Sequence, residues 1–308
     1  MTSLSERSTV PQYSAQQYAA QQYAAQQYAA QQGTANRLID KQSEQQWPFC
    51  QTPPTMYDLP SEFPEEPGLP DEFHDLQPQL LSRTLSLKNY ASTNRFTGSD
   101  LNVYYDIAHP LWHKRPDWFL ALDVPRVYEG ERGKDSRMSY VVWQEGRSPA
   151  VIVEFLSYRT EREDLGRFYG EADFIADPNP EIQKDLPAEV AGTGRAKPPS
   201  KVEMYEQYLK VPHYIVDSKY TQRLRYFKHN GSIYEEQPVA ESAPKIWLAD
   251  LEIGLGLWDD YFEELPGPWL RWCDSAGNWL LTDTERAQAE ANRLKAKLRE
   301  LGIDPNQL

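Results

Sequence analysis

The chain has 308 residues, of which 40% are hydrophobic and 12% are aromatic, and its formal net charge at pH 7 is -14. This length accommodates one large domain with appendages or two small domains. The negative charge argues against a generally basic protein that coats nucleic acid non-specifically, but it leaves room for a local basic groove beside metal-binding carboxylates. The mean hydropathy of -0.73 favours a single folded centre with solvated ends.

The two cysteines, Cys50 and Cys273, lie far apart in the sequence and show no metal-ligand spacing. We therefore expect no disulfide framework and a reduced, cytoplasmic setting. The N-terminus lacks the apolar core of a secretory signal. No apolar run approaches the roughly 18 residues of a spanning helix, so we expect no membrane partner.

The first 98 residues form two segments of unusual composition. Residues 16–30 are three copies of QQYAA, and this five-residue period fits neither a helix nor a strand. We expect residues 1–45 to be a disordered, low-complexity tail. Residues 46–80 contain eight prolines and seven acidic residues without a Lys or Arg. Proline at this density argues against a regular helix and predicts an extended, Pro-rich acidic arm over residues 46–98.

Globular patterning begins near residue 99 and predicts one domain over residues 99–282. Alternating or continuous apolar residues predict strands at 100–107, 115–124, 139–144, 150–156 and 213–218. Helical patterns cover residues 158–174 and 200–211, with Ser200 as the N-cap of the second helix and an irregular, Pro-containing insertion between them.

Hairpins and a helix are predicted for the C-terminal third. One hairpin covers residues 223–237 and turns at Asn230–Gly231. Residues 245–258 predict a further strand, and residues 268–282 a second hairpin. The last segment, 283–308, is an amphipathic helix with a heptad seam at Ala287, Ala291, Leu294, Leu298 and Leu301. This seam fits a helix lying on its own domain and a short dimer coil equally well.

Glu154 is the only charged residue in SPAVIVEFLS (148–157). The apolar residues around it predict a strand buried on both faces. A carboxylate in such a strand is costly unless a charged or hydrogen-bonding group meets it. Asp117 directly precedes another apolar strand, and carboxylates on neighbouring strands can converge on one point. Two converging carboxylates are the ligand set that Mg²⁺ takes, together with water and phosphate oxygens.

Three stretches in this order, RPDW (115–118), VIVEFLSYRTEREDLG (151–166) and KVEMYEQYLKVPHYIVD (201–217), resemble motifs of the Uma family of proposed endonucleases. That family lies within the PD-(D/E)XK restriction-endonuclease-like superfamily. The stretches 56–81 and 100–118 also resemble a subgroup of the family, so the similarity covers roughly residues 56–302. The resemblance implies an α/β fold with a mixed central sheet flanked by helices, an extended N-terminal arm and a C-terminal helix.

The same resemblance implies a catalytic site. In this superfamily an Asp and a Glu bind the metal, which gives Asp117 and Glu154 as ligands of Mg²⁺ or Mn²⁺. A lysine near the Glu positions or activates the attacking water, but Leu156 stands at the usual lysine position. Lys201, in the Lys-x-x-x-Tyr helix, is then the candidate catalytic lysine. The implied reaction is metal-assisted hydrolysis of phosphodiester bonds in nucleic acid, with DNA as the expected substrate.

Other residues are expected to support this site. Ser157 and Asp164 match family positions and are expected to cap the following helix or shape the groove. Tyr205 lies one helical turn from Lys201 and is expected to orient it. The candidate phosphate contacts are Arg115, Arg159 and Arg162. A homodimer through the nuclease domain or the C-terminal helix is a further expected partner.

Two other functions stay open from the sequence. A catalytically inactive binding or scaffold protein would keep the fold without the reaction, and Leu156 and the net acidity favour it. A metal-dependent hydrolase of a different substrate would share Asp117 and Glu154. Closure of Glu154 by an arginine would favour the scaffold, whereas convergence with Lys201 in a solvent-reachable cleft would favour the enzyme.

Zinc and nucleotide sites are not expected. His109 and His113 are four residues apart in HPLWH, but Pro110 opposes a helical pair and no third ligand stands at a supporting spacing. The sequence has no Gly-rich phosphate-binding motif.

Overall fold

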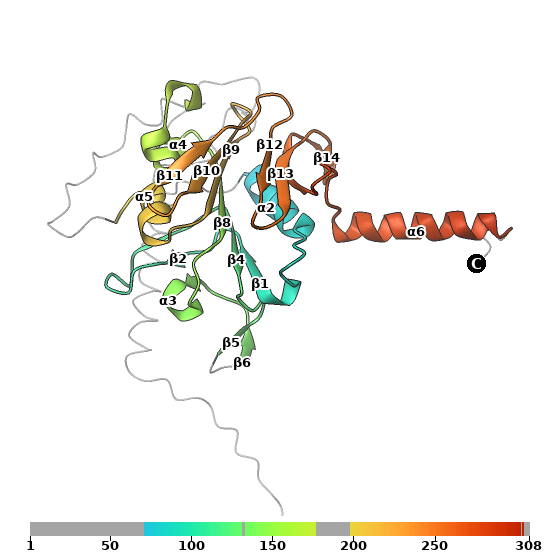
Figure 1. Cartoon of the computed structure of the whole chain (residues 1–308), viewed down its shortest axis with the longest axis horizontal. Coiled ribbons are helices and arrows are strands. Elements are labelled where there is room, and N and C mark those ends of the chain that lie inside the picture. The colour runs from blue at the N-terminus through green and yellow to red at the C-terminus, as the bar shows by residue number, and fades with distance from the viewer. Residues whose placement is uncertain (1–70, 131–132, 177–197, 303, 305–308) are drawn as a thin grey trace, which may run out of the picture. The chain divides into compact units, whose positions relative to one another are not determined.

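A computed structural model describes residues 71–130, 133–176, 198–302 and 304 (Figure 1). All of them belong to one compact unit, Met56–Leu308. The expected tail, the first part of the arm and most of the irregular insertion lie outside the described residues. The segment boundaries at residues 45, 98 and 282 stay predictions.

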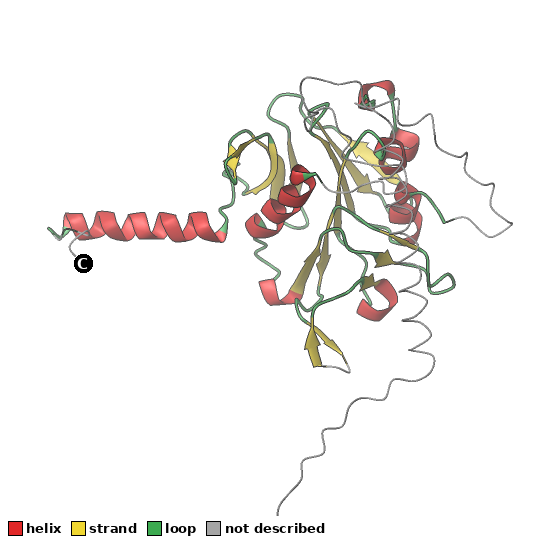
Figure 2. Ribbon diagram, turned by 180° about the vertical axis from the view of Figure 1, so that it is seen from behind, coloured by secondary structure: helices red, strands yellow, loops and turns green. Residues whose placement is uncertain are grey.

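A six-stranded mixed sheet forms the centre of the fold (Figure 2), with the strand order β1–β4–β8–β9–β10–β11. Strands β8 and β9 are parallel, and all other neighbours in this sheet are antiparallel. This architecture confirms the expected α/β class with a mixed central sheet. The strands are β1 (Arg95–Gly98), β4 (Trp118–Leu122), β8 (Val151–Phe155), β9 (His213–Ser218), β10 (Arg223–His229) and β11 (Tyr234–Gln237).

The two faces of this sheet pack into separate hydrophobic clusters, because successive side chains of a strand point to opposite faces. Ile152 and Leu156 belong to the first cluster, together with residues of the helices α4 (Glu161–Leu165) and α5 (Lys201–Glu203). Val153 belongs to the second cluster, with residues of the helix α2 (Glu72–Thr84) and of a three-stranded sheet. The strands of that sheet are β12 (Lys245–Leu248), β13 (Ile253–Trp258) and β16 (Trp269–Cys273).

Helix α2 corrects part of the expectation of an extended arm over residues 46–98, because Glu72–Thr84 is helical. Figure 1 shows this helix beside β12 and β13. Its first turn is capped by Asp71, whose carboxylate accepts a hydrogen bond from the His74 N–H at 3.0 Å. Pro78 lies inside the helix, where it lacks a backbone donor. Burial of Leu81 and two hydrogen bonds between Gln77 and the Leu270 backbone, of 2.7 and 2.8 Å, outweigh this cost.

The expected helix over residues 158–174 is shorter than predicted. Helix α4 ends at Gly166, whose φ of +48° suits a residue without a side chain. The chain then makes two short turns, η2 (Gly166–Phe168) and η3 (Glu171–Asp173). The helix expected from residue 200 does begin there, as α5, and Ser200 caps it through a hydrogen bond from the Glu203 N–H at 3.3 Å. It continues as a π-helical turn, Met204–Tyr208.

Other elements follow the expected pattern in part. The hairpin of β10 and β11 is confirmed, and Gly231 at its turn has φ +102°. The expected strand 139–144 ends after two residues and gives way to a helical turn, and the segment 245–258 forms two strands instead of one. The segment 268–282 contains one strand and a single bridge between Cys273 and Trp279. The remaining elements are η1 (Ser92–Asn94), β2 (Val103–Tyr104), β3 (His113–Lys114), β5 (Tyr128–Gly130), β6 (Gly133–Asp135), β7 (Tyr140–Val141), α3 (Val142–Glu145), β14 (Tyr261–Phe262), β15 (Leu265–Pro266) and α6 (Asp283–Glu300).

Helix α6 begins with a reciprocal cap between Thr282 and Glu285, and none of its residues is buried. Glu285 also receives a hydrogen bond from the buried Arg271 of β16, which ties the start of the helix to the adjacent strand. In the described part of the chain, no helix is both long and apolar enough to cross a membrane.

Candidate active site

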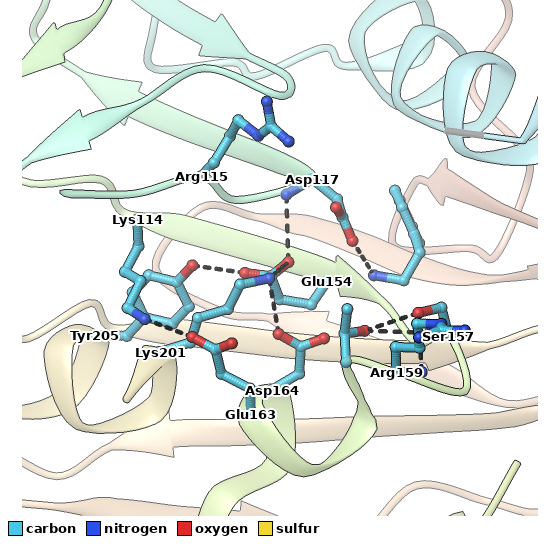
Figure 3. A network of polar contacts seen from close by, with 12 residues as sticks. Lys114, Arg115, Asp117, Glu154, Ser157, Arg159, Glu163, Asp164, Lys201 and Tyr205 are labelled. Atoms are coloured by element: carbon cyan, nitrogen blue, oxygen red, sulfur yellow. Dashed lines mark hydrogen bonds and ion pairs between the residues drawn. The ribbon is translucent and has the colours of Figure 1, made fainter. Parts of the chain in front are cut away.

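Asp117 and Glu154 are brought together by the pairing of β4 with β8. Trp118 lies opposite Val153 in this antiparallel pair, so Asp117 and Glu154 are neighbours on the same face of the sheet. The Asp117 N–H donates a hydrogen bond to Glu154 Oε2 at 3.3 Å, and Asp117 Oδ2 accepts one from the Phe155 N–H at 2.6 Å (Figure 3). Glu154 is completely buried, whereas Asp117 is partly exposed.

Lys201 and Tyr205 reach the same carboxylate from the segment that begins with α5. Lys201 Nζ lies 3.1 Å from Glu154 Oε2 and 2.8 Å from Asp164 Oδ1. The Tyr205 hydroxyl donates a hydrogen bond to Glu154 Oε1 at 2.6 Å. The ammonium group therefore bridges two buried carboxylates, and both oxygens of Glu154 are engaged. Glu154 is enclosed by a lysine and a tyrosine, not by the arginine that the scaffold alternative anticipated.

The electrostatics of this cluster are dominated by burial. Burial raises the pKa of Glu154 well above its usual value; Lys201 and Tyr205 oppose this effect, and the charges of Asp117 and Asp164 add to it. Burial also raises the pKa of Asp164, against the pull of Lys201. For Lys201, burial would lower the pKa, but the attraction of Asp164 and Glu154 prevails and holds it well above the usual value. Lys201 is thus an ammonium ion surrounded by three carboxyl groups.

The donor atoms of this cluster fit a hard divalent cation. Carboxylate oxygens are the preferred protein ligands of Mg²⁺ and Mn²⁺. Among the residues that the structure describes, no three His, Cys, Asp or Glu side chains form a protein-only metal cage. Mg²⁺ does not need one, because it commonly takes one or two carboxylates and completes its shell with water and phosphate oxygens. Asp117 and Glu154 are the pair that would supply those carboxylates.

Asp164 and Ser157, both expected as supporting residues, have different surroundings. Asp164 is fully buried and pairs directly with Lys201 instead of capping a helix. Ser157 lies in the turn between β8 and α4, where its carbonyl accepts hydrogen bonds from the N–H groups of Thr160 and Glu161 at 3.3 and 3.2 Å. Its role is therefore to shape this turn, since its hydroxyl hydrogen-bonds within the turn, to the Thr160 hydroxyl and the Arg159 N–H.

The three candidate phosphate contacts lie near the site but make local interactions. Arg115 forms an ion pair with Asp100, with 2.8 Å between Nε and Oδ1, and both side chains are about half exposed. The guanidinium groups of Arg159 and Arg162 stack over the rings of Tyr158 and Tyr169, at 5.2 and 4.7 Å from the ring centroids. These contacts position the three cations without burying them completely.

His74 is a residue near the site that the sequence did not reveal. Its Nδ1 lies 2.8 Å from Asp71 Oδ1 and its Nε2 lies 3.2 Å from the Phe155 carbonyl oxygen. Both partners are acceptors, so only the doubly protonated ring donates to both. Burial lowers the pKa of His74, but Asp71 and Asp117 more than reverse this effect. The backbone C=O and N–H of Phe155 thereby link His74 to Asp117. No local sequence pattern predicts a contact over such a separation.

A family model with the description "Putative restriction endonuclease" matches residues 42–260, which is more than half of the chain and includes Asp117, Glu154 and Lys201. No curated protein sequence matches the chain. That description is of a nuclease, an enzyme that hydrolyses nucleic acid. The chain belongs to the Uma2 family and has its restriction-endonuclease-like fold.

Proposed function

We propose that this protein is a Mg²⁺-dependent endonuclease that hydrolyses phosphodiester bonds of nucleic acid, with DNA as its substrate. The observation that carries the proposal is the buried Glu154 carboxylate, which shares one lysine with Asp164 beside Asp117. Burying several carboxylates around one ammonium group is a poor way to stabilise a fold, since apolar residues of similar volume do as well or better. The three carboxyl groups outnumber the single ammonium group of Lys201, and this arrangement suits a protein that binds a metal cation at the cluster.

In this proposal Asp117 and Glu154 hold the metal through their carboxylate oxygens. A bound Mg²⁺ or Mn²⁺ supplies Lewis acidity toward the phosphate and lowers the pKa of a coordinated water. Lys201 takes the place of the lysine that is absent at Leu156, and its ammonium group offsets negative charge as it develops on the phosphate. Asp164 and Tyr205 hold Lys201 and Glu154 in position through the contacts described above.

Nucleic-acid binding is proposed to depend on the cations around this cluster. Arg115, Arg159 and Arg162 are partly or largely exposed, whereas the chain as a whole carries a formal charge of -14. Affinity should therefore fall steeply as salt concentration rises, because each phosphate contact releases counterions. A cytoplasmic site of action suits the buried, free Cys273.

A binding or scaffold protein is the second candidate, and one observation favours it. Lys201 and Tyr205 already satisfy both oxygens of Glu154, so the buried carboxylate does not depend on a metal for hydrogen bonding. In that case Lys201 would be a permanent internal counterion, and metal would have no measurable effect on the protein.

A homodimer through α6 is the proposed assembly. Leu294 and Leu301 of its seam are 53% and 67% exposed, and most of the stability of a helix in a protein comes from packing of its apolar face. In a parallel pair of these helices, Glu290 of one copy would face Lys295 of the other across the seam, which favours a second copy of the chain as the partner.

The test of the proposed activity is a plasmid-nicking assay with Mg²⁺, with Mn²⁺ and with a chelator. The wild-type protein should nick supercoiled DNA only with metal, and Glu154→Gln should be inactive while remaining folded. The matched control is Glu241→Gln, which changes an exposed loop glutamate and should nick like the wild type. Nicking that persists in Glu154→Gln would exclude this site as the catalytic centre.

A further inference from the structure

The loop between β2 and β3 carries an exposed apolar tip. We define the tip as residues 107–111, all of which are exposed, and its two large aliphatic side chains, Ile107 and Leu111, are 70% and 82% exposed. A single exposed leucine is common on protein surfaces. Two large aliphatic residues exposed within five residues of one loop call for a specific explanation, since contact with water is unfavourable for both.

The conformation of the tip is fixed by its polar and aromatic neighbours. Asp106 accepts hydrogen bonds from the Ala108 N–H at 2.9 Å and from His109 Nδ1 at 2.7 Å. The rings of His109 and Trp112 are stacked, with 3.8 Å between their centroids, and the Trp112 N–H donates to the His109 carbonyl at 2.8 Å. None of these contacts involves the side chain of Ile107 or Leu111, and both side chains point from a loop whose conformation other residues fix.

Both ends of this loop lie against elements of the candidate active site. Before the tip, the Tyr105 ring packs edge-on against Tyr208, at 5.2 Å between centroids, in the segment that carries Tyr205. After the tip, Lys114 Nζ pairs with Glu163 at 2.5 Å, next to Asp164 in α4. Figure 3 shows Lys114 and the following Arg115 beside the Glu154 cluster. The tip therefore stands on the face of the sheet that carries Glu154, with cationic residues following it.

We infer that the tip inserts between bases of the nucleic acid that the active site cleaves, with Ile107 and Leu111 as an apolar wedge. The inference rests on the proposed function and adds a contact to bases. Apolar wedges of one or two side chains unstack base steps in many nucleic-acid-binding proteins, while nearby cations hold the phosphates. A protein partner fits less well, because a specific protein interface buries at least about 1,200 Å² in total.

The test compares three variants of the full chain by fluorescence anisotropy with a fluorescein-labelled DNA duplex in the presence of a chelator. Ile107→Ser/Leu111→Ser should raise the Kd about tenfold, the order expected when the burial of about one large aliphatic side chain is lost. The tenfold ratio of the two Kd values should be the same at low and high salt, since an apolar contact releases no counterions. Arg162→Ala should instead make the DNA affinity depend less steeply on salt concentration. Tyr261→Ser removes a 66% exposed aromatic side chain from β14 and should bind like the wild type.

The outcomes separate the wedge from the catalytic proposal. Wild-type affinity in Ile107→Ser/Leu111→Ser would overturn the wedge, while metal-dependent nicking that Glu154→Gln abolishes would still support the nuclease. A wild-type protein that does not bind the duplex at all would overturn the wedge as well. If the double variant alters sedimentation instead of DNA affinity, the tip is an interface between copies and the inference is wrong. A duplex with 2-aminopurine should brighten on binding the wild type and stay dim with the double variant.

Discussion

The two faces of β8 differ in what they bury. On one face, Val151, Val153 and Phe155 join a hydrophobic cluster beneath α2 and the sheet of β12, β13 and β16. On the other face, Ile152 and Leu156 flank Glu154, which meets Lys201 beneath α4 and α5. One face of this short strand therefore packs only apolar side chains, and the other face also carries a buried ion pair. The apolar side shows that this strand packs well without charge, and under the proposed function the charged side serves metal binding and catalysis.

The largest effect should come from placing a carboxylate on the apolar face. Val153→Asp would bury a charge among leucine and tryptophan side chains with no lysine to receive it. We expect a loss of more than about 4 kcal/mol in the free energy of unfolding, enough to prevent folding of many domains. Circular dichroism and urea unfolding would measure this. A variant that unfolds at the wild-type urea concentration would show that the two faces do not differ in their tolerance of charge.

The second effect concerns the cation on the charged face. Lys201→Met leaves Glu154 and Asp164 buried without their counterion, which should cost about 3–5 kcal/mol of unfolding free energy at neutral pH. The pKa values of both acids are raised in the folded protein, so the folded state binds protons more tightly and the variant should regain stability as the pH falls toward 5. Urea unfolding at several pH values is the measurement.

The control for this variant is Lys228→Met, which removes an exposed lysine of β10 and should change stability little. Added Mg²⁺ should restore part of the stability of Lys201→Met if a divalent cation takes over the role of the ammonium group. A Lys201→Met protein as stable as the wild type, with no response to pH or Mg²⁺, would contradict the importance of this ion cluster.

The third effect is on the pH dependence of stability and comes from Asp217, a buried carboxyl group of β9 in the central sheet. Burial raises the pKa of Asp217 to about 7, against a backbone hydrogen bond at Ser218 that lowers it. The folded state therefore binds a proton that the unfolded state has released, and stability should decline between about pH 4 and pH 7, by up to roughly 4 kcal/mol. Asp217→Asn cannot titrate and should lose that part of the pH dependence. An unchanged stability profile in the variant would mean that Asp217 is ionised throughout.

The smallest effect on the folded domain is expected from α6. Leu294→Ser/Leu298→Ser should leave the thermal unfolding of the domain nearly unchanged, because no residue of this helix is buried. The same variant should convert a dimer into a monomer in sedimentation velocity if the seam binds a second copy. Equal sedimentation of the variant and the wild type would rule out α6 as the dimer contact.

How far the sequence predicts this fold depends on the range of the interactions involved. Strands β8 and β9 were predicted from continuous apolar runs, because such runs reflect burial directly. Helix α2 was not predicted, because local proline content argued against it and its stability comes from packing against distant residues such as Leu270. The break after α4 depends on Gly166, whose left-handed conformation the helical pattern alone does not reveal.

For the candidate site, too, the residues with a local sequence signal were predicted and the long-range contacts were not. Glu154 stood out because a lone charge in an apolar strand is unusual, and Asp117 because it directly precedes another apolar strand. The role of Lys201 followed from the resemblance, and Tyr205 from its spacing of one helical turn from Lys201. The direct pairing of Asp164 with Lys201 depends on how the segments pack in space, as does the link from His74 to Asp117 through the Phe155 backbone. Neither had a signal in local spacing.

The most direct test of the central claim is isothermal titration of Mg²⁺ into the wild-type protein and into Glu154→Gln, with Glu241→Gln as the control. If Glu154 is a metal ligand, the wild type and the control should bind Mg²⁺ at one site, and Glu154→Gln should lose about 10–100-fold in affinity or more. If neither the wild type nor Glu154→Gln binds Mg²⁺, or both bind it equally, Glu154 and Lys201 are an internal ion pair and the scaffold function is the better description.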